Sequence, residues 1–220
     1  MTSDDLEKLY DTRFSEKERV RKDRVWKVLC ESYFQQFVKE DGAVLDVACG
    51  LGEFVRHIRA ARRVAVDINP AVARELPPDV EFICASAESI PSIADRSIDV
   101  CFASNFFEHL PSKAAMDGVL QEARRMLRPG GRFVCMQPNI RYAGGRYWDF
   151  YDHVLPLSHK SAAEGFAKNG YIIERLIPRF VPFTTKSAFP QNPALVRAYL
   201  WLPFLWRIFG GQFVLVARRD

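Results

Sequence analysis

Two aspartates in this chain, one within an apolar run and one at the end of another, form a pattern typical of a nucleoside-binding site. Asp46 lies in the run Val44-Leu-Asp-Val47 and precedes a Gly-x-Gly turn formed by Gly50 and Gly52. Asp67 closes a second apolar run. A carboxylate at the end of a second strand is suited to bind a ribose diol. Asp46 would repel the pyrophosphate of a dinucleotide, because like charges repel at close range.

These charges predict a nucleoside ligand whose tail is positively charged and carries no phosphate. S-adenosylmethionine (SAM) meets that description. The main alternative is a nicotinamide-dependent oxidoreductase. It requires a third glycine in the turn, and Glu53 and Phe54 stand in the region where that glycine would fall.

The site requires parallel strands to position it, and the sequence predicts them. Five short apolar runs lack sustained polar alternation, as strands buried on both faces of a parallel sheet do. They cover residues 43–48, 63–67, 80–84, 98–103 and 132–137. We expect a helix from about Glu16 to Val38, which Asp41-Gly42 would follow as a break. A further amphipathic helix should begin after Gly52.

The clearest predicted helix lies between the fourth and fifth strands. Ser112 is its expected N-cap, and Arg128-Pro-Gly-Gly131 is expected to end it and turn the chain into the next strand. Apolar residues recur within it at three- and four-residue steps: Met116, Val119, Leu120, Ala123, Met126 and Leu127. Alternation of this kind predicts right-handed crossovers and an open, doubly wound sheet.

Beyond Pro138 the pattern changes. Residues 139–160 are rich in aromatic residues, His, Gly and Arg without a clear period, and a short helix is expected over 160–168. Two more strands are expected over 171–177 and 212–217. Between them, residues 194–209 form a strongly apolar helical segment that Pro203 should kink.

Four motifs together resemble those of class I SAM-dependent methyltransferases. In chain order they are Val44-Leu-Asp-Val-Ala-Cys-Gly-Leu-Gly52, Val66-Asp-Ile-Asn-Pro70, Ser97-Ile-Asp-Val100 continuing into Phe107-Glu-His-Leu110, and Leu127-Arg-Pro-Gly-Gly131. The resemblance covers roughly residues 40–140. It implies an α/β, Rossmann-like, doubly wound sheet of seven strands in the order 3-2-1-4-5-7-6, with strand 7 antiparallel and helices on both faces.

The resemblance also implies roles for individual residues. Asp46 and the loop Ala48, Cys49, Gly50 and Gly52 would face the methionine moiety of SAM. Asp67 would bind both ribose hydroxyls, and Ile68 would pack on the adenine. Ser86 stands where the family often has Asp, while Ala87 would offer a backbone N–H to the ring. Asn105 would line the cleft near the transferred methyl group. The product would be S-adenosylhomocysteine.

The resemblance further suggests a division of the chain. Residues 1–40 would form an N-terminal helical cap or lid, in which Tyr10-Asp-Thr-Arg-Phe14 could fold over SAM so that Arg13 reaches its carboxylate. Residues 41–220 would form the methyltransferase domain. Within that domain, 139–160 and 178–211 would be insertions on the substrate side.

The catalytic candidates follow the fifth strand. His153 and His159 suit a general base because the pKa of imidazole lies near neutrality, and Asp152 is adjacent to His153. A packed, hydrogen-bonded loop histidine is the alternative for each. His109 is a weaker candidate at the end of the fourth strand. Asp152, His153 and His159 form one local cluster that lacks the ligand spacing typical of a metal site, so no metal site is predicted.

Composition narrows the partners. The net charge of +4 is mild, and there is no dense Lys/Arg block or Asn-Pro-Pro-Tyr motif, so a nucleic-acid substrate is not expected. The five cysteines are expected to be reduced, buried thiols. The polar N-terminus predicts no secretory signal. We therefore expect a cytoplasmic protein.

The chain from Gln137 onward resembles methyltransferases found with bacterial polysaccharide-assembly enzymes. This resemblance implies methyl transfer to a small-molecule or saccharide-type acceptor, on oxygen more often than on nitrogen. The segment 194–209 is expected to cap the core or form a dimer face. Its alternative is an interfacial helix that contacts a membrane surface or a lipid-linked acceptor. A non-catalytic subunit with the same fold, acting as a scaffold, is the rival from another class. The oligomeric state is left open.

Overall fold

A computed structural model describes residues 16–183 and 192–220 of the chain. It contains a seven-stranded sheet of order β3-β2-β1-β4-β5-β7-β6, which confirms the expected topology. β7 pairs antiparallel with β5 and β6, and the other neighbouring strands are parallel. The strands are β1 (Ala43–Val47), β2 (Arg62–Asp67), β3 (Glu81–Cys84), β4 (Ile98–Ser104), β5 (Leu127–Pro138), β6 (Tyr171–Ile177) and β7 (Gln212–Arg219).

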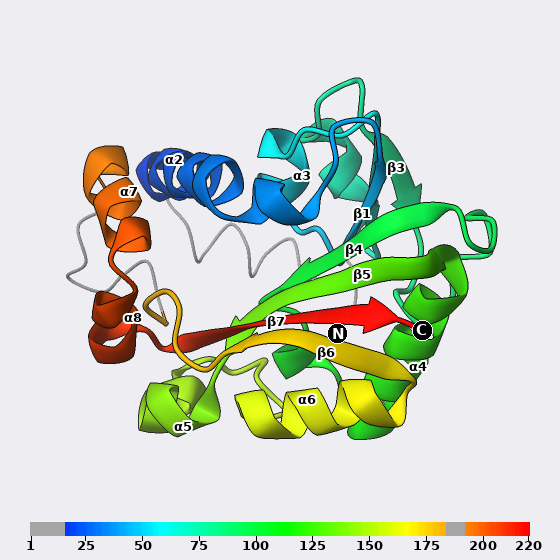
Figure 1. Ribbon diagram of the computed structural model, residues 1–220. Helices are drawn as coiled ribbons and strands as arrows, with labels where there is room; N and C mark the ends of the chain where they lie inside the picture. The colour runs from blue at the N-terminus through cyan, green and yellow to red at the C-terminus, as the bar shows by residue number, and fades with distance from the viewer. Residues whose placement is uncertain (1–15, 184–191) are drawn as a thin grey trace.

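Helices cover both faces of this sheet (Figure 1). One face carries α2 (Glu16–Ser32), α3 (Glu53–His57) and α7 (Pro193–Trp201); the other carries α4 (Lys113–Met126) and α6 (His159–Lys168). The remaining helices are η1 (Phe34–Phe37), η2 (Pro70–Arg74), η3 (Phe107–His109), α5 (Ile140–Ala143), η4 (Gly144–Asp149) and α8 (Pro203–Phe209). The expected first helix therefore ends at Ser32, and a separate short 3-10 turn follows.

The helix α4 forms as its apolar period predicts. Its periodic residues are buried against the sheet, and Ser112 caps the first turn by accepting a hydrogen bond from the N–H of Ala115 (3.1 Å). The pairing of β4 with β5 shifts register after Ile98. Arg128 reaches back from this irregularity to Asp99 (2.7 Å). The helix ends at Met126, just before this segment, and the Arg-Pro-Gly-Gly residues belong to β5, which begins at Leu127 and not at the expected residue 132.

Aromatic side chains fill the opposite face of the sheet. Phe54 from α3 stacks on Phe102 from β4 with ring centroids 3.6 Å apart, and Phe34 packs edge-on against Phe102. Val196, Tyr199 and Leu200 of α7 are buried in the same cluster. Full burial of one such aliphatic or aromatic side chain contributes about 1.5–3 kcal/mol. The inner side of α7 is therefore part of the core.

The helix α8 differs from α7, although both belong to the segment predicted to be one kinked helix. The chain breaks at Pro203 as expected, and none of the residues of α8 is buried. We call the exposed apolar side chains of this region the α7–α8 apolar surface: Leu195, Trp201, Leu202, Phe204, Ile208 and Phe209. α5, α7 and α8 lie at the end of the sheet where β6 ends and β7 begins (Figure 1).

The cysteines follow the strands with one exception. All five are free thiols; four are buried, and Cys84 is exposed. Cys84 closes β3, which is an edge strand, so one flank of this residue meets solvent. The expectation of buried thiols was therefore wrong for Cys84.

Two further expectations concern the ends and surface of the chain. The segment Tyr10–Phe14, with the proposed Arg13 contact, lies outside the described residues. None of the helices within the described ranges combines the length and the apolar character that crossing a bilayer requires.

Candidate functional site

The sequence-predicted cofactor residues meet at the carboxyl ends of β1, β2, β3 and β4. The chain leaves β1 toward β2 on one side, and β4 lies on the other, so β1 and β4 flank the point where strand order reverses. Ligands bind at such a point in open α/β sheets. The loop after β1 folds tightly there, with positive φ at Ala48 (53°), Gly50 (54°) and Gly52 (74°). At Gly52 an added Cβ would also collide with the Leu76 side chain.

Asp46 is a buried carboxylate beneath this loop. Its side chain accepts one hydrogen bond, from the N–H of Val55 at 3.3 Å. Burial raises the pKa of Asp46 well above its ordinary value, the Val55 hydrogen bond opposes that shift, and Glu53 and Asp67 add to it. Among residues 16–183 and 192–220, no cationic side chain forms an ion pair with it. The site therefore holds a buried carboxyl group whose charged form a cationic ligand would stabilise.

Asp67 fixes the end of β2 to the loop after β1. One carboxylate oxygen accepts the N–H of Gly50 and the other accepts the N–H of Asn69, each at 2.9 Å. An ionised carboxylate has about four acceptor positions, so acceptor capacity remains for a ligand. Burial raises the pKa of Asp67, and these backbone hydrogen bonds partly offset the rise.

Three predicted residues line the neighbouring strand ends. Ile68 directly follows β2 and is 52% exposed. The segment after β3 lies close by, since the N–H of Ala85 donates to the carbonyl of Asp67 (3.1 Å). Ser86 is exposed and its hydroxyl accepts the N–H of Glu88 (3.3 Å), while Ala87 is buried.

Asn105 begins the turn after β4. It has a positive φ of 47°, a conformation that Asn tolerates better than most residues, and its N–H donates to Met136 (3.0 Å). The side chain of Gln137 at the end of β5 accepts the N–H groups of Phe106 and Phe107 (3.0 and 3.3 Å). These bonds hold the chain that leads into η3.

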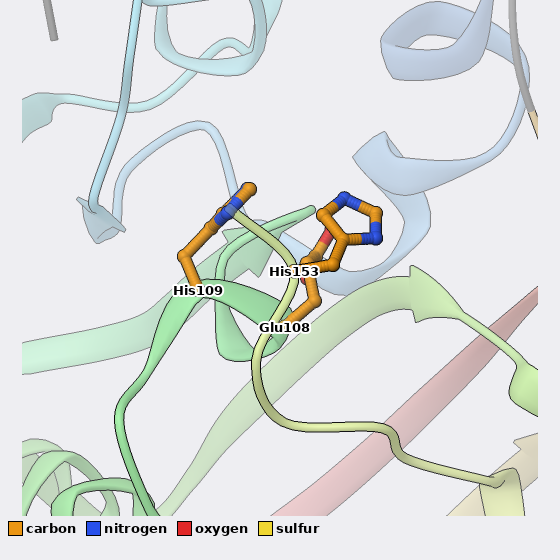
Figure 2. Close-up of side chains that lie close together, drawn as sticks. All are labelled: Glu108, His109 and His153. Carbon is orange, nitrogen blue, oxygen red and sulfur yellow. The ribbon is translucent and has the colours of Figure 1, made fainter. Parts of the chain in front are cut away.

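A second group of polar side chains gathers where η3 meets the segment after η4. The carbonyl of Glu108 accepts the N–H groups of Val154 and Leu155 (2.7 and 3.0 Å), which joins the two segments. Figure 2 shows Glu108, His109 and His153 brought together by this junction. Asp152 completes the group, because its carboxylate lies 3.2 Å from Nδ1 of His109.

The charges in this group are strongly perturbed. Glu108 is 3% exposed, and neither of its carboxylate oxygens has a hydrogen-bond partner among the described residues. Burial raises the pKa of Glu108 to about 7, an effect that His109 opposes. For His109, burial alone lowers the pKa, but Asp152 and Glu108 together bring the pKa above its ordinary value.

The two predicted base candidates have different surroundings. The ring of His153 lies among aromatic rings, 4.8 Å from Phe150 and 4.7 Å from Tyr147 between centroids. His159 instead lies at the start of α6, where its Nδ1 is 2.9 Å from the side-chain nitrogen of Asn139. Burial, assisted by Arg141 and Lys160, lowers the pKa of His159. The structure thus gathers Asp152 and His153 with Glu108 and His109, and gives His159 separate contacts.

Sequence reasoning did not single out three residues that organise the site. Glu108 was noted only as a neighbour of His109, and its isolation from hydrogen bonds depends on packing from distant segments. Gln137 and Asn139 follow β5, where polar residues at a strand end were the available signal. Asn139 is fully buried and links His159 to the carbonyl of Pro178 (2.7 Å).

Comparisons with known proteins agree with this geometry. The methyltransferase domain family matches residues 45–135. A ubiquinone/menaquinone biosynthesis C-methyltransferase, UbiE of Nitrobacter hamburgensis, is 36% identical over 189 residues, which cover 78% of this chain and 70% of that protein. Matches to the UbiE proteins of Brucella anthropi and Bartonella tribocorum span 128 residues, about half the length of those proteins. The chain belongs to the class I SAM-dependent methyltransferases.

Solved structures share the fold at low identity. A SAM-dependent methyltransferase from Archaeoglobus fulgidus has a TM-score of 0.64 at 18% identity, covering 88% of this chain and 92% of that one. Geranyl diphosphate C-methyltransferase from Streptomyces coelicolor, in complex with Mg²⁺, geranyl diphosphate and S-adenosylhomocysteine, has a TM-score of 0.60 at 15% identity, covering 86% and 78%. The cofactor is SAM, which sets the oxidoreductase alternative aside. The matches to the methyltransferase domain family and to a C-methyltransferase set the non-catalytic scaffold aside.

Proposed function

We propose that this methyltransferase acts on a ring carbon of a quinol-type small molecule that carries an apolar tail. The observation that carries the proposal is the 36% identity to a protein named as a ubiquinone/menaquinone biosynthesis C-methyltransferase. The chain corresponds to 70% of that relative, and the acceptor is inferred from this partial match together with the site.

The residues at the strand ends fit SAM. The negative charge of buried Asp46 suits the cationic end of the cofactor, and the free acceptor capacity of Asp67 suits the ribose diol. Exposed Ile68 would cover the adenine, with Ser86 and Ala87 at its edge. When bound, SAM supplies a methyl group already activated for in-line transfer. Much of the remaining task for the protein is positioning the acceptor.

The second group of residues is the proposed acceptor wall. It follows directly on Asn105, the residue proposed to lie near the transferred methyl group. The partly exposed rings of Phe150 and His153 offer flat apolar faces to a planar ring, and the fully buried ring of Tyr147 packs behind His153. His109, oriented by Asp152, offers a polar contact to a ring hydroxyl. Asp152, His153 and His159 remain the candidates for accepting a proton, and residues 1–40 the candidate lid.

The α7–α8 apolar surface supports a lipid-soluble acceptor. Trp201 and Phe204 are 78% and 59% exposed, and they lie at the same end of the sheet as the site (Figure 1). Exposed aromatic and aliphatic side chains flanked by Arg197 and Arg207 are typical of a surface that enters the lipid headgroup region. We propose peripheral contact with a membrane, from which such an acceptor would be drawn.

An oxygen of a saccharide-type acceptor is the second candidate target. The polar set Glu108, His109 and Asp152 favours it, because a hydroxyl acceptor must lose a proton and such side chains can receive one. Arg197 and Arg207 do not distinguish the two acceptors, because their charges suit contact with either one.

Incubation with ¹³C-methyl SAM tests these alternatives. Prenylated hydroquinones lacking one ring methyl and a panel of free and lipid-linked saccharides would each be offered, and the product examined by NMR. A ring-bound methyl signal on the hydroquinone is expected. A methyl-ether signal on a saccharide, with none on the hydroquinone, would overturn the quinol proposal.

A further inference from the structure

We propose that Glu108, His109 and His153 bind a divalent transition-metal ion, with Zn²⁺ the ion that this donor set suits best. Each side chain offers one ligand atom, and these three atoms lie within 4.8 Å of one another. They come from two segments, η3 and the loop after η4, which the carbonyl of Glu108 joins through Val154 and Leu155. The site concerns metal binding itself and holds whichever acceptor the enzyme methylates.

The orientation of His109 is that of a metal ligand. Its Nδ1 lies 3.2 Å from a carboxylate oxygen of Asp152 and 3.1 Å from the Asp152 carbonyl. Both partners only accept hydrogen bonds, so Nδ1 must carry the proton and Nε2 is left with a lone pair. Metal-binding histidines almost always donate their second N–H to a carboxylate or carbonyl in this way, which fixes the tautomer.

Glu108 provides an independent reason to expect a cation. Its residue is 3% exposed, and neither carboxylate oxygen has a hydrogen-bond partner among the residues that the structure describes. A buried polar group without a partner is costly, and a buried carboxylate more so. In Figure 2 its side chain lies beside that of His153. A metal ion would satisfy both the charge and the unused acceptor positions.

His153 is the third proposed ligand, and neighbouring aromatic rings pack against its side chain. Its ring is stacked on Phe150, lies 4.7 Å from Tyr147 and is 5.2 Å from the ring of His109 between centroids. Packed rings hold a ligand in place before the metal arrives, which lowers the ordering cost of binding.

The donor set points to zinc. Two imidazoles and one carboxylate, with an open fourth position, are a common catalytic zinc arrangement, whereas Mg²⁺ and Ca²⁺ prefer oxygen ligands throughout. Zn–N and Zn–O distances are about 2.0–2.2 Å, so coordination would draw the three donor atoms somewhat closer by side-chain rotation. Glu108 and Asp152 together carry the charge that a divalent ion neutralises. On the proposed function, the open position would suit an acceptor oxygen.

Metal titration of the full chain tests the site without any assay of activity. The chelator-treated protein would be titrated with Zn²⁺ by calorimetry and with Co²⁺ by visible absorption. One ion per chain, a Co²⁺ spectrum of four- or five-coordinate type, and a rise in Tm with Zn²⁺ are expected. Absence of stoichiometric binding, or a six-coordinate Co²⁺ spectrum like that of the aqueous ion, would overturn the proposal.

Variants locate the ion. Glu108→Gln and His153→Asn should each weaken Zn²⁺ binding at least tenfold, and Asp152→Asn, which leaves all three ligands in place, by about 10–100-fold. Cys84→Ser removes the exposed thiol and should leave affinity unchanged, as should His57→Gln on the opposite face of the sheet. Unchanged affinity in Glu108→Gln and His153→Asn, or loss of binding in Cys84→Ser, would show that the ion binds elsewhere. If a variant fails to fold, the Co²⁺ spectrum of the wild-type protein still shows whether the protein holds a four- or five-coordinate ion.

Discussion

The carboxylate of Asp67 accepts the backbone N–H of Gly50 at 2.9 Å, which ties the end of β2 to the turn after β1. The turn after β1 and the end of β2, which the sequence predicts to share one ligand, are thus in direct contact. The hydrogen bond holds the loop at Gly50, where the backbone has a positive φ of 54°. A ligand that binds Asp67 therefore meets a loop already held in place.

Replacement of Asp67 by Ala should weaken SAM binding by about 1–3 kcal/mol, because charge-assisted hydrogen bonds to the ribose and the contact with Gly50 are both lost. Asp67→Asn should have a smaller effect, since one acceptor oxygen remains. Calorimetric titration measures both, and Asp41→Ala, at an exposed aspartate, is the matched control. Equal affinity in wild type and Asp67→Ala would remove the ribose assignment.

As the pH is lowered, SAM affinity should begin to fall at a pH above the one at which an exposed aspartate becomes protonated. The pKa values of Asp46 and Asp67 in the free protein are raised, chiefly by burial, and the cationic cofactor binds the ionised forms. Affinity is therefore constant above the raised pKa values and declines as pH falls through them. Titrations from neutral pH down through the range in which exposed aspartates titrate test this. A decline confined to the range of exposed aspartates would contradict it.

Asp46→Asn should stabilise the protein in the absence of ligand while weakening SAM binding. A folded-state pKa above the unfolded value means that the stability contributed by this group is present at low pH and is lost as pH rises through the folded pKa. Above the unfolded-state pKa the group therefore opposes folding, because its ionisation costs more in the folded protein than in the unfolded chain, and a neutral amide can still accept the N–H of Val55. Denaturant unfolding should show a gain of about 1–2 kcal/mol, the usual range when a functional site is relieved of strain. A loss of similar size would contradict the charge argument.

His153→Ala should lower kcat by about 10²-fold or more and leave the SAM dissociation constant nearly unchanged, because the residue lies on the proposed acceptor wall. Single-turnover transfer to the accepted substrate and calorimetry with SAM would separate the two effects. Ile172→Ala, at an exposed position on the edge strand β6, serves as the comparison. Full activity in His153→Ala would exclude both a base and a metal-ligand role in catalysis.

The α7–α8 apolar surface should bind lipid. Vesicles containing anionic lipid should retain the wild-type protein, and Trp201→Ser combined with Phe204→Ser should release it without changing the free energy of unfolding, since both side chains are exposed. Leu200→Ala, on the buried side of α7, should instead cost about 2–5 kcal/mol of stability. If the wild-type protein does not bind vesicles, the proposed membrane contact of the α7–α8 apolar surface is wrong.

The core of the fold could be predicted because local signals agreed with one another. Apolar runs marked the strands, although β3 at the sheet edge has no buried residue. Ser112 marked the start of α4, and Pro203 marked the break between α7 and α8. The short helices α5 and η4 escaped prediction, since segments of four and six residues have no room for a period.

The second polar group could not be predicted in full for a different reason. His109 and Asp152 are far apart in sequence, and their contact depends on Glu108 accepting backbone hydrogen bonds from Val154 and Leu155. Tertiary packing of this kind leaves no trace in local composition. The exposure of Cys84, by contrast, follows from the position of β3 at the sheet edge, which the expected strand order already implied.

Calorimetric titration of the purified protein with SAM, S-adenosylhomocysteine and NAD tests the central claim most directly. Binding of the first two at micromolar concentration, with none of NAD, is the predicted result. Binding of NAD without SAM would contradict the assignment of Asp46 as the partner of a cationic ligand, and with it the function proposed for this site.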